Sequence, residues 1–286
     1  MRPEVYIKSI TFNDSSTFVF DKKDIIVFTG ANNAGKSQVL REVMQNFESP
    51  SSPTKVITTT IDSEYSGEIS ELKSEAVYMG GQYWLGNIQL HNLNFIDNWW
   101  NNRSLSSLSR YFVNHLTTEQ RLHSASSPSS FNQLEQLPSH PIQVLYANDE
   151  KESELSSYFH KAFNSHIIVN RGAGSVIPLH VGEKPTMQIG EDRVSRSYLE
   201  RLGRLPQLQT QGDGMRSFTG ILLDVFTSKH TITLIDEPEA FLHPPQARLL
   251  GKMLAKNKPN DRQLFISTHS EDFLKGLLDA DSDNVK

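Results

Sequence analysis

The chain has 286 residues, 37% of them hydrophobic, and a net charge of −5, as expected for a soluble globular protein of one or two domains. It has no cysteine, which excludes disulfides, zinc–thiolate sites and thiol catalysis within this sequence. No apolar run approaches the roughly 18 residues of a membrane span, and the first residues lack a signal-peptide core. We therefore expect a cytoplasmic protein without a membrane partner. The negative net charge does not indicate that the protein binds nucleic acid, but it does not exclude a local basic patch that could do so.

Strand-like segments open the chain. Residues 5–12 and 17–20 are separated by turn formers, which predicts a hairpin leading into a third strand at residues 25–28. Residues 54–61 are rich in β-branched side chains and are predicted to form another strand.

A glycine-rich loop follows the strand at residues 25–28. It fits the pattern G-x-x-x-x-G-K-[ST] and leads into a segment with helical periodicity. Glycines let successive backbone N–H groups turn inward around phosphate oxygens, and a helix N-terminus adds its positive dipole end. The residues expected to bind ATP are Gly30, Asn32, Asn33, Ala34, Gly35, Lys36, Ser37 and Gln38.

Two side chains of this loop have distinct expected roles. Lys36 can reach the β- and γ-phosphates, and the Ser37 hydroxyl can hold Mg²⁺. The competing interpretation is a chance match, which a random chain of this length would give on the order of one time in a hundred. The strand before the loop and the helix after it favour the nucleotide site.

A second apolar strand, residues 232–235, ends in Asp236 and Glu237. We expect Asp236 to orient Mg²⁺ or its waters, and Glu237 to accept a proton from the attacking water. Acidic residues often end strands, so this pattern alone is a weak signal. Together with Lys36 and Ser37 it indicates a site that hydrolyses a nucleoside triphosphate.

His269 follows a further buried strand at residues 264–266, where it is expected to contact the γ-phosphate. Gln120, after a predicted strand at residues 110–116, is a candidate to hold magnesium and the water; an ordinary exposed glutamine is the alternative. A helix is predicted over residues 150–163, and the arginines between residues 193 and 204 are expected to form a solvated face.

A glycine-flanked segment opens a predicted helix near residue 213, with Phe218, Ile221, Leu222 and Val225 on its buried side. It lies too far along the chain to join the first loop easily. Its backbone N–H groups are expected to meet phosphate on a second subunit; the alternative is a helix cap made by Asp213. The residues of this segment are Gly212, Asp213, Gly214 and Arg216.

The order of these motifs resembles the ABC-type ATPases. The stretch G-A-N-N-A-G-K-S and the stretch D-E-P-E-A-F-L-H-P at residues 236–244 are most similar to the branch of SMC-like and OLD-family ATPases and of bacterial anti-phage ATPases such as PtuA of the Septu and retron systems. The resemblance implies an α/β P-loop NTPase fold of ABC-ATPase type. Its parts would be a mixed central sheet, an N-terminal antiparallel β subdomain and an inserted helical subdomain. Residues 1–125 and 205–286 would form the ATPase head, and residues 126–204 the subdomain inserted between Gln loop and signature helix.

The resemblance further implies that ATP and Mg²⁺ are bound and that heads pair head-to-tail, as a homodimer or higher oligomer. Residues 241–243 would communicate between the two sites. Two departures stand out. The family's signature usually has serine before its glycines, where this chain has Gln211 and Gly212, so hydrolysis is expected to be slow. The sequence also stops soon after His269, so a longer parent protein is expected.

Three functions stay open. The first is an ATPase switch in anti-phage defence that controls a nuclease effector acting in trans. The second is a DNA-repair or chromosome-maintenance ATPase of the SMC/OLD type, which predicts a long coiled coil or a basic groove that the sequence lacks. The third is an ATP-sensing scaffold that binds nucleotide and barely turns it over. An ABC transporter subunit ranks last.

Overall fold

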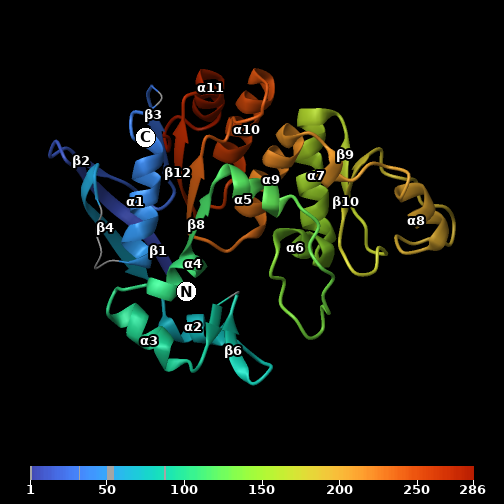
Figure 1. The fold of residues 1–286 in the computed structure, drawn as a ribbon, viewed down its shortest axis with the longest axis horizontal. Helices are drawn as coiled ribbons and strands as arrows, with labels where there is room; N and C mark the ends of the chain where they lie inside the picture. Colours follow the sequence, from blue (N-terminus) through green and yellow to red (C-terminus); the bar gives the residue numbers. More distant parts are fainter. Residues whose placement is uncertain (1, 32, 50–54, 87) are drawn as a thin grey trace.

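A parallel four-stranded sheet is the centre of the molecule (Figure 1). The computed structural model describes residues 2–31, 33–49, 55–86 and 88–286. All neighbouring strands of this sheet run parallel, in the order β3-β12-β11-β8, so their carboxyl ends share one edge. The strands are β3 (Ile25–Thr29), β8 (Val113–Leu116), β11 (Ile232–Asp236) and β12 (Gln263–Thr268).

Both faces of this sheet are covered, as the unbroken apolar runs of a parallel sheet require. Ile26 and Phe265 belong to one core, whereas Ile25 and Ile266, their neighbours along the strands, belong to the other. The first core is closed by α1 (Lys36–Glu48) and the antiparallel sheet. The second is closed by α9 (Asp213–Thr227), α10 (Pro244–Asn257) and α11 (Glu271–Ala280).

The N-terminal hairpin is confirmed. β1 (Glu4–Phe12) pairs antiparallel with β2 (Thr17–Val19) and, on its other side, with β4 (Thr58–Ser66). The antiparallel strands thus lie in a sheet of their own beside the parallel one. The strand predicted over residues 54–61 begins only at Thr58, because the amides just before it donate to the Glu42 carboxylate; residues 50–54 lie outside the described part of the chain.

Small elements join β4 to β8 along one end of the sheet. The predicted strand at residues 110–116 is wrong in its first half, because Tyr111 and Phe112 end a short helix. Phe112 packs on Trp100, and Tyr111 donates its hydroxyl to Glu75. These elements are α2 (Ile69–Ser74), β5 (Val77–Met79), β6 (Gln82–Leu85), β7 (Ile88–Leu90), α3 (Asn94–Asn101), a 3₁₀ turn (Ser106–Leu108) and α4 (Ser109–Phe112).

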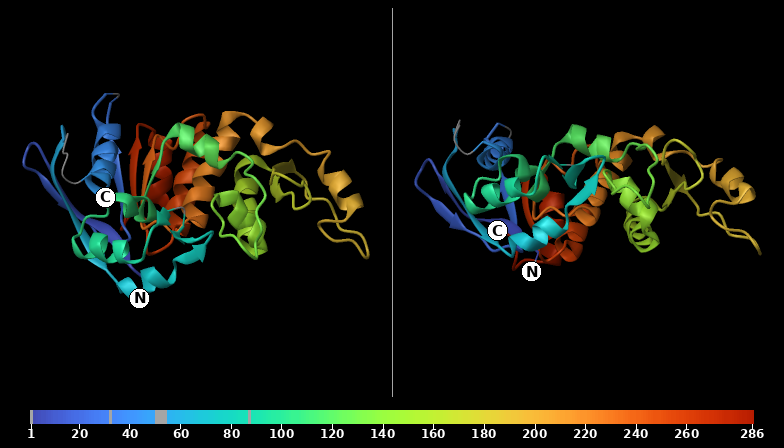
Figure 2. Two further views of the ribbon diagram at one scale, coloured as in Figure 1. Left: turned by 60° about the horizontal axis from the view of Figure 1, so that its bottom comes forward. Right: turned by 90° about the horizontal axis from the view of Figure 1, so that it is seen from below.

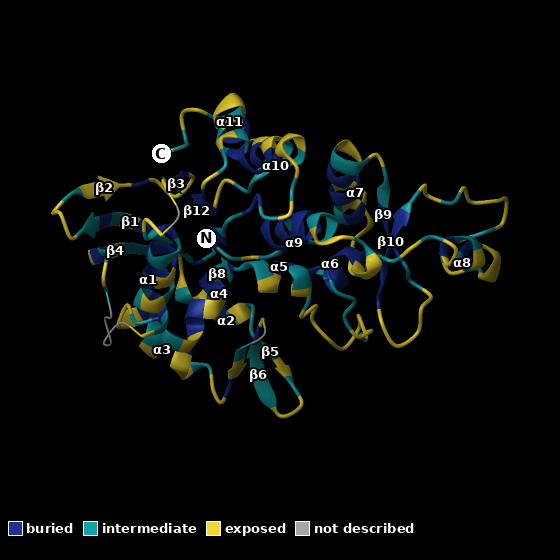
Figure 3. Ribbon diagram, turned by 45° about the horizontal axis from the view of Figure 1, so that its top comes forward, coloured by how far each residue is buried: buried dark blue, intermediate teal, exposed yellow. Residues whose placement is uncertain are grey.

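The segment between α5 (Thr118–Ser124) and α9 extends away from the sheet, with α8 at its far end (Figures 1 and 2). Buried residues follow the sheet and α9, whereas the outlying loops are exposed (Figure 3). The division at residues 126 and 204 stays a prediction. The segment holds α6 (Pro141–Ala147), α7 (Asp149–Phe163), β9 (His166–Val169), β10 (Leu179–Gly182), α8 (Arg196–Leu202) and a 3₁₀ turn (Leu208–Thr210). Among the described residues no helix is long and apolar enough to cross a bilayer.

Within that segment the helix predicted over residues 150–163 is confirmed as α7, but the solvated arginine face is wrong. Arg193 is largely buried and forms two hydrogen bonds with the Glu152 carboxylate, and Arg201 pairs with Glu191. Arg196, 93% exposed, and Arg204, also exposed, fit the prediction. Glu152, the partner of Arg193, lies 41 residues away on α7. The spacing of the arginines in the sequence could not indicate this ion pair.

A buried carboxyl in α9 gives a stability prediction. Asp224 is almost fully buried, one of its oxygens accepts from Asn114 Nδ2, and burial raises its pKa to about 6. Because the folded state favours the neutral acid, the contribution of this group to stability is largest below pH 4 and is lost as pH rises through 6. Asp224→Asn should therefore increase the free energy of unfolding above pH 6 by on the order of 2 kcal/mol.

Urea unfolding of wild type and variant between pH 4 and 8 measures this difference, which should shrink toward zero near pH 4. Asp283→Asn, at an exposed aspartate near the C-terminus, is the matched control and should show no such trend. A constant difference across the range would contradict the assignment.

Candidate functional site

The predicted phosphate loop adopts a conformation that its glycines make possible. Gly35 has φ +89° and is the N-cap of α1, and Asn33 also lies in the left-handed region at φ 63°. A Cβ on Gly35 would come 2.3 Å from Ile57 Cδ1, so a side chain there would also require the end of the Ile57 side chain to move. Asn32 lies outside the described residues.

Lys36 is buried and its ammonium lies inside the loop. Nζ donates to the carbonyl oxygens of Gly30 and Ala31, at 3.0 and 2.8 Å. Its positive charge is therefore held by loop carbonyls close to the inward-facing backbone, as a phosphate-binding lysine requires.

A fully buried carboxylate fixes the segment that covers the loop. Glu42, two turns into α1, accepts hydrogen bonds from the amides of Val56, Ile57 and Thr58 and from the Thr58 hydroxyl. Burial opposes its ionisation, but these bonds outweigh it, and the pKa of Glu42 is lowered. The carboxylate therefore anchors Ile57 against Gly35.

Ser37 and Asp236 meet, although 199 residues separate them. The Ser37 hydroxyl donates to Asp236 Oδ1 at 2.7 Å, and the buried Ser267 hydroxyl donates to the same oxygen. The register of the sheet explains this, since Asp236 pairs with Ser267, and β12 lies directly between β11 and β3. A hydroxyl beside one carboxylate is a donor set that Mg²⁺ takes when phosphate oxygens complete its shell.

Glu237 and His269 face each other across the strand ends. His269 Nδ1 lies 3.4 Å from Oε1 of Glu237 and from Oε1 of Glu239, and both His269 and Glu237 are about half-exposed. Buried Glu239 accepts from the Thr268 hydroxyl at 2.7 Å and from the His269 amide at 3.0 Å. Glu239 thus sets the position of the His269 backbone, while Glu237 stays open to solvent.

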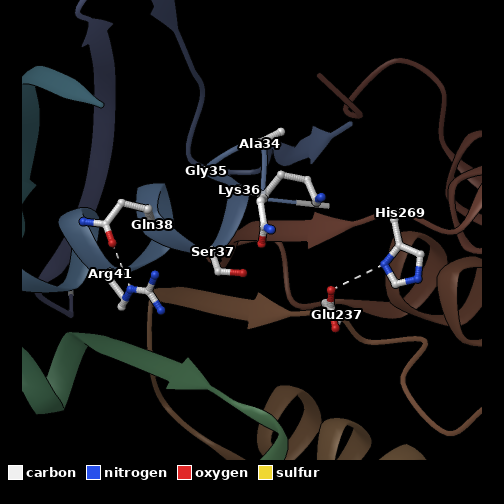
Figure 4. Close-up of a pocket in the computed structure, with 9 residues that line it drawn as sticks. Ala34, Gly35, Lys36, Ser37, Gln38, Arg41, Glu237 and His269 are labelled. Carbon is white, nitrogen blue, oxygen red and sulfur yellow. Dashed lines mark hydrogen bonds and ion pairs between the residues drawn. The ribbon is translucent and has the colours of Figure 1, made fainter. Parts of the chain in front are cut away.

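Lys36, Ser37, Glu237 and His269 line one pocket of about 700 Å³, within the range for small-ligand sites, whereas Asp236 lies behind Ser37 and is not among the lining residues. Figure 4 shows Lys36, Ser37 and Glu237 directed into it, with His269 at one side and Gln38 and Arg41 at the other. The N-terminus of α1 at Gly35, the Lys36 ammonium and the Ser37–Asp236 pair fit a nucleotide triphosphate with Mg²⁺. No cluster of three or more His, Asp and Glu side chains suited to a metal occurs among the described residues.

His115 on β8 lies near the Ser37–Asp236 pair. Burial is the main cause that lowers the pKa of His115 below its ordinary value; the Asp236 carboxylate raises it, and Arg41 lowers it further. The imidazole is therefore neutral at physiological pH and adds no positive charge beside Asp236.

Gln120 does not lie among the pocket-lining residues. Its side chain accepts from the Thr117 amide, and its own amide donates to the Thr117 hydroxyl, which makes a capping box at the start of α5. The sequence T-T-E-Q matches that motif, so the alternative of an exposed glutamine describes this conformation. The predicted magnesium role of Gln120 would require this capping box to open.

The glycine-flanked segment at the start of α9 also lies outside the pocket lining. The cap predicted at Asp213 is wrong, because Gly212 is the N-cap and Asp213 pairs with Arg216 at 2.9 Å. A Cβ on Gly214 would come 2.6 Å from the Phe241 carbonyl, so α9 begins directly against the loop after Glu239. Among the described residues, its two chain neighbours aside, none lies within 4 Å of a Cβ built on Gly212.

Sequence reasoning missed three residues of this site. Glu239 was available in the D-E-P-E string, and Arg41 lies one turn after Ser37 on the same helix, so spacing could have indicated both. Ser267 needed the register between β11 and β12, which sequence does not give.

Comparisons with known proteins bear on the fold and on the family. An SMC head bound to the C-winged helix domain of ScpA is similar at 12% identity, covering 95% of this chain and 91% of that one, with TM-score 0.52. The SMC head domain from Thermotoga maritima is 14% identical over 96% and 92% of the two chains, with TM-score 0.42. A nucleotide-free ATP-binding cassette from an ABC transporter is 11% identical over 96% and 84%, with TM-score 0.39.

At 12% identity, the similarity to the SMC head bound to ScpA shows the fold alone. The fold is that of a P-loop ATPase head, which confirms the predicted fold class. The comparison with curated proteins gave no match. The model of the family described as "AAA domain, putative AbiEii toxin, Type IV TA system" matches residues 25–274, and the chain belongs to that family.

Proposed function

We propose that this protein binds ATP with Mg²⁺ and hydrolyses it slowly, as the switch subunit of a bacterial defence system. The observation that carries the proposal is the convergence of Lys36, Ser37 and Glu237 on one pocket, with Asp236 bonded to Ser37. Lys36 and the loop amides would hold the phosphates, and Ser37 with Asp236 would hold Mg²⁺, which neutralises phosphate charge. Glu237 would take the proton of the attacking water, with His269 beside it.

We propose that two heads pair, as the resemblance to the ABC-type ATPases implies. No described residue of the α9 start lines the pocket, and its lining comes from the strand ends, α1 and the loops beside them. A second copy would place its Gly212–Gly214 turn over the open side, where helix-terminal N–H groups favour phosphate. The altered signature, with Gln211 before Gly212, supports slow turnover.

The defence role is supported by the family description, which names a putative toxin of a toxin–antitoxin system, and by the resemblance to anti-phage ATPases. The nuclease effector would be a separate chain. The SMC/OLD alternative would require DNA to bind; filter binding at low salt distinguishes it, since contacts to phosphates weaken steeply with salt.

The direct test is release of phosphate from ATP by the purified protein, measured together with its mass in solution with ATP, with ADP and without nucleotide. We expect a turnover that requires Mg²⁺ and a rate per chain that rises with protein concentration, because the complete site needs two copies. ATP binding without phosphate release would favour the sensing scaffold, and absence of ATP binding would end the proposal.

A further inference from the structure

Arg121 is a completely buried arginine that contacts both the loop after β11 and helix α9. It lies in the middle of α5, with none of its side chain exposed. Burial lowers its pKa to about 10, and the carboxylates of Asp236, Glu239 and Glu237 act in the opposite direction. The guanidinium is therefore charged at physiological pH, directly behind the acidic loop of the pocket.

One side of this guanidinium holds the loop that carries the proposed base. Its two terminal nitrogens donate to the carbonyl oxygens of Asp236 and Glu237, the latter at 3.2 Å. Glu237 has φ 47°, a left-handed conformation that a residue with a side chain adopts only when its surroundings impose it. The bonds from Arg121, together with the Glu237 amide donating to the Ser267 carbonyl, supply that constraint.

The other side of the guanidinium holds α9. Arg121 Nε donates to the Ser217 hydroxyl at 3.1 Å, and Ser217 is fully buried in the first turns of α9, just after the Gly212–Arg216 segment. The two helices touch through their backbones, because a Cβ on Gly220 would come 2.1 Å from the Arg121 carbonyl. A displacement of the start of α9 therefore cannot avoid Arg121.

We infer that Arg121 is a positioning residue that couples the start of α9, through Ser217, to the orientation of Glu237. This inference rests on the proposed function. When the α9 turn of one copy engages the nucleotide of another, the Ser217–Arg121 bond carries the change to the Glu237 of the same chain. Each copy then hydrolyses its own ATP only when its neighbour's site is also filled, which is a coupling between two binding sites.

Ser217→Ala tests the coupling most directly, because it removes the link to α9 and leaves the bonds from Arg121 to the loop carbonyls. We expect kcat to fall about tenfold, within the range of allosteric couplings, with the Kd for ATP changed less than twofold. The Hill coefficient for ATP in the hydrolysis assay should fall from above one toward one. Loss of packing alone would not change cooperativity in this way.

Thr219→Val is the matched control. Thr219 is equally buried, two residues further along α9, and its hydroxyl donates only to the Met215 carbonyl of the same helix. It should keep wild-type kcat and cooperativity. If Ser217→Ala fails to fold, Ser217→Cys, which keeps the volume and weakens the hydrogen bond, takes its place in the comparison.

Wild-type kcat and cooperativity in Ser217→Ala would overturn the inference while the proposed function stands. An equal loss in Thr219→Val would overturn it too, because general packing would then explain the effect. If the wild-type protein shows no ATP hydrolysis at all, the proposed function fails, and the coupling fails with it.

Discussion

Glu237→Gln is expected to lower the rate of ATP hydrolysis by about 10²- to 10⁴-fold, the usual contribution of a general base. The amide has nearly the shape of the carboxylate but cannot accept the proton of the attacking water. The Glu237 carboxylate is about half-exposed in the pocket, and no described residue other than His269 pairs with its charge, so the substitution should leave the surrounding structure intact. Phosphate release in a single turnover measures the chemical step, and the Kd for ATP, measured separately, reports binding.

ATP affinity should stay within a few-fold of wild type, and the ATP-bound assembly should last longer, because the bound nucleotide is no longer cut. Glu271→Gln, at an exposed glutamate of α11, is the matched control and should hydrolyse normally. Wild-type turnover in Glu237→Gln would show that another group takes the proton.

The central sheet and the site at its edge were predictable because each is encoded in short local patterns. The four strands β3, β8, β11 and β12 are followed by Gly30, Thr117, Glu237 and His269, and the carboxyl ends of parallel strands meet at one edge. The position of Gly30 and Gly35 around the loop follows from the same local signal, since only glycine tolerates these backbone angles without strain.

The errors arise where distant partners decide the outcome. The strand expected from residue 54 starts late because the amides before it donate hydrogen bonds to the Glu42 carboxylate. Arg193 is largely buried because its guanidinium pairs with the Glu152 carboxylate. Gln120 was assigned by its place in the order of motifs, whereas the capping box with Thr117 is a local competitor for its side chain. No sequence pattern indicated the neighbouring Arg121, since its four partners lie on α5, on α9, at the last residue of β11 and in the loop after it.

Lys36→Met is expected to raise the Kd for Mg-ATP by about 100-fold, or roughly 3 kcal/mol, the sum of one or two charged hydrogen bonds. Methionine keeps much of the length of the side chain and removes the ammonium that now donates to the Gly30 and Ala31 carbonyls. Titration calorimetry with ATP and with ADP measures the change. The loss should be larger for ATP than for ADP, because the lysine is expected to reach the γ-phosphate.

Lys275→Met, at an exposed lysine of α11 paired only with Glu271, is the control for loss of one positive charge and should bind ATP normally. Thermal unfolding without nucleotide is needed as well, since Lys36 also holds its own loop. If the midpoint temperature of Lys36→Met stays within a few degrees of wild type, its weaker affinity for ATP reports the missing contact to phosphate. Unchanged ATP binding in Lys36→Met would mean that this pocket is not where nucleotide binds, and the roles assigned to Ser37, Asp236 and Glu237 would fall with it.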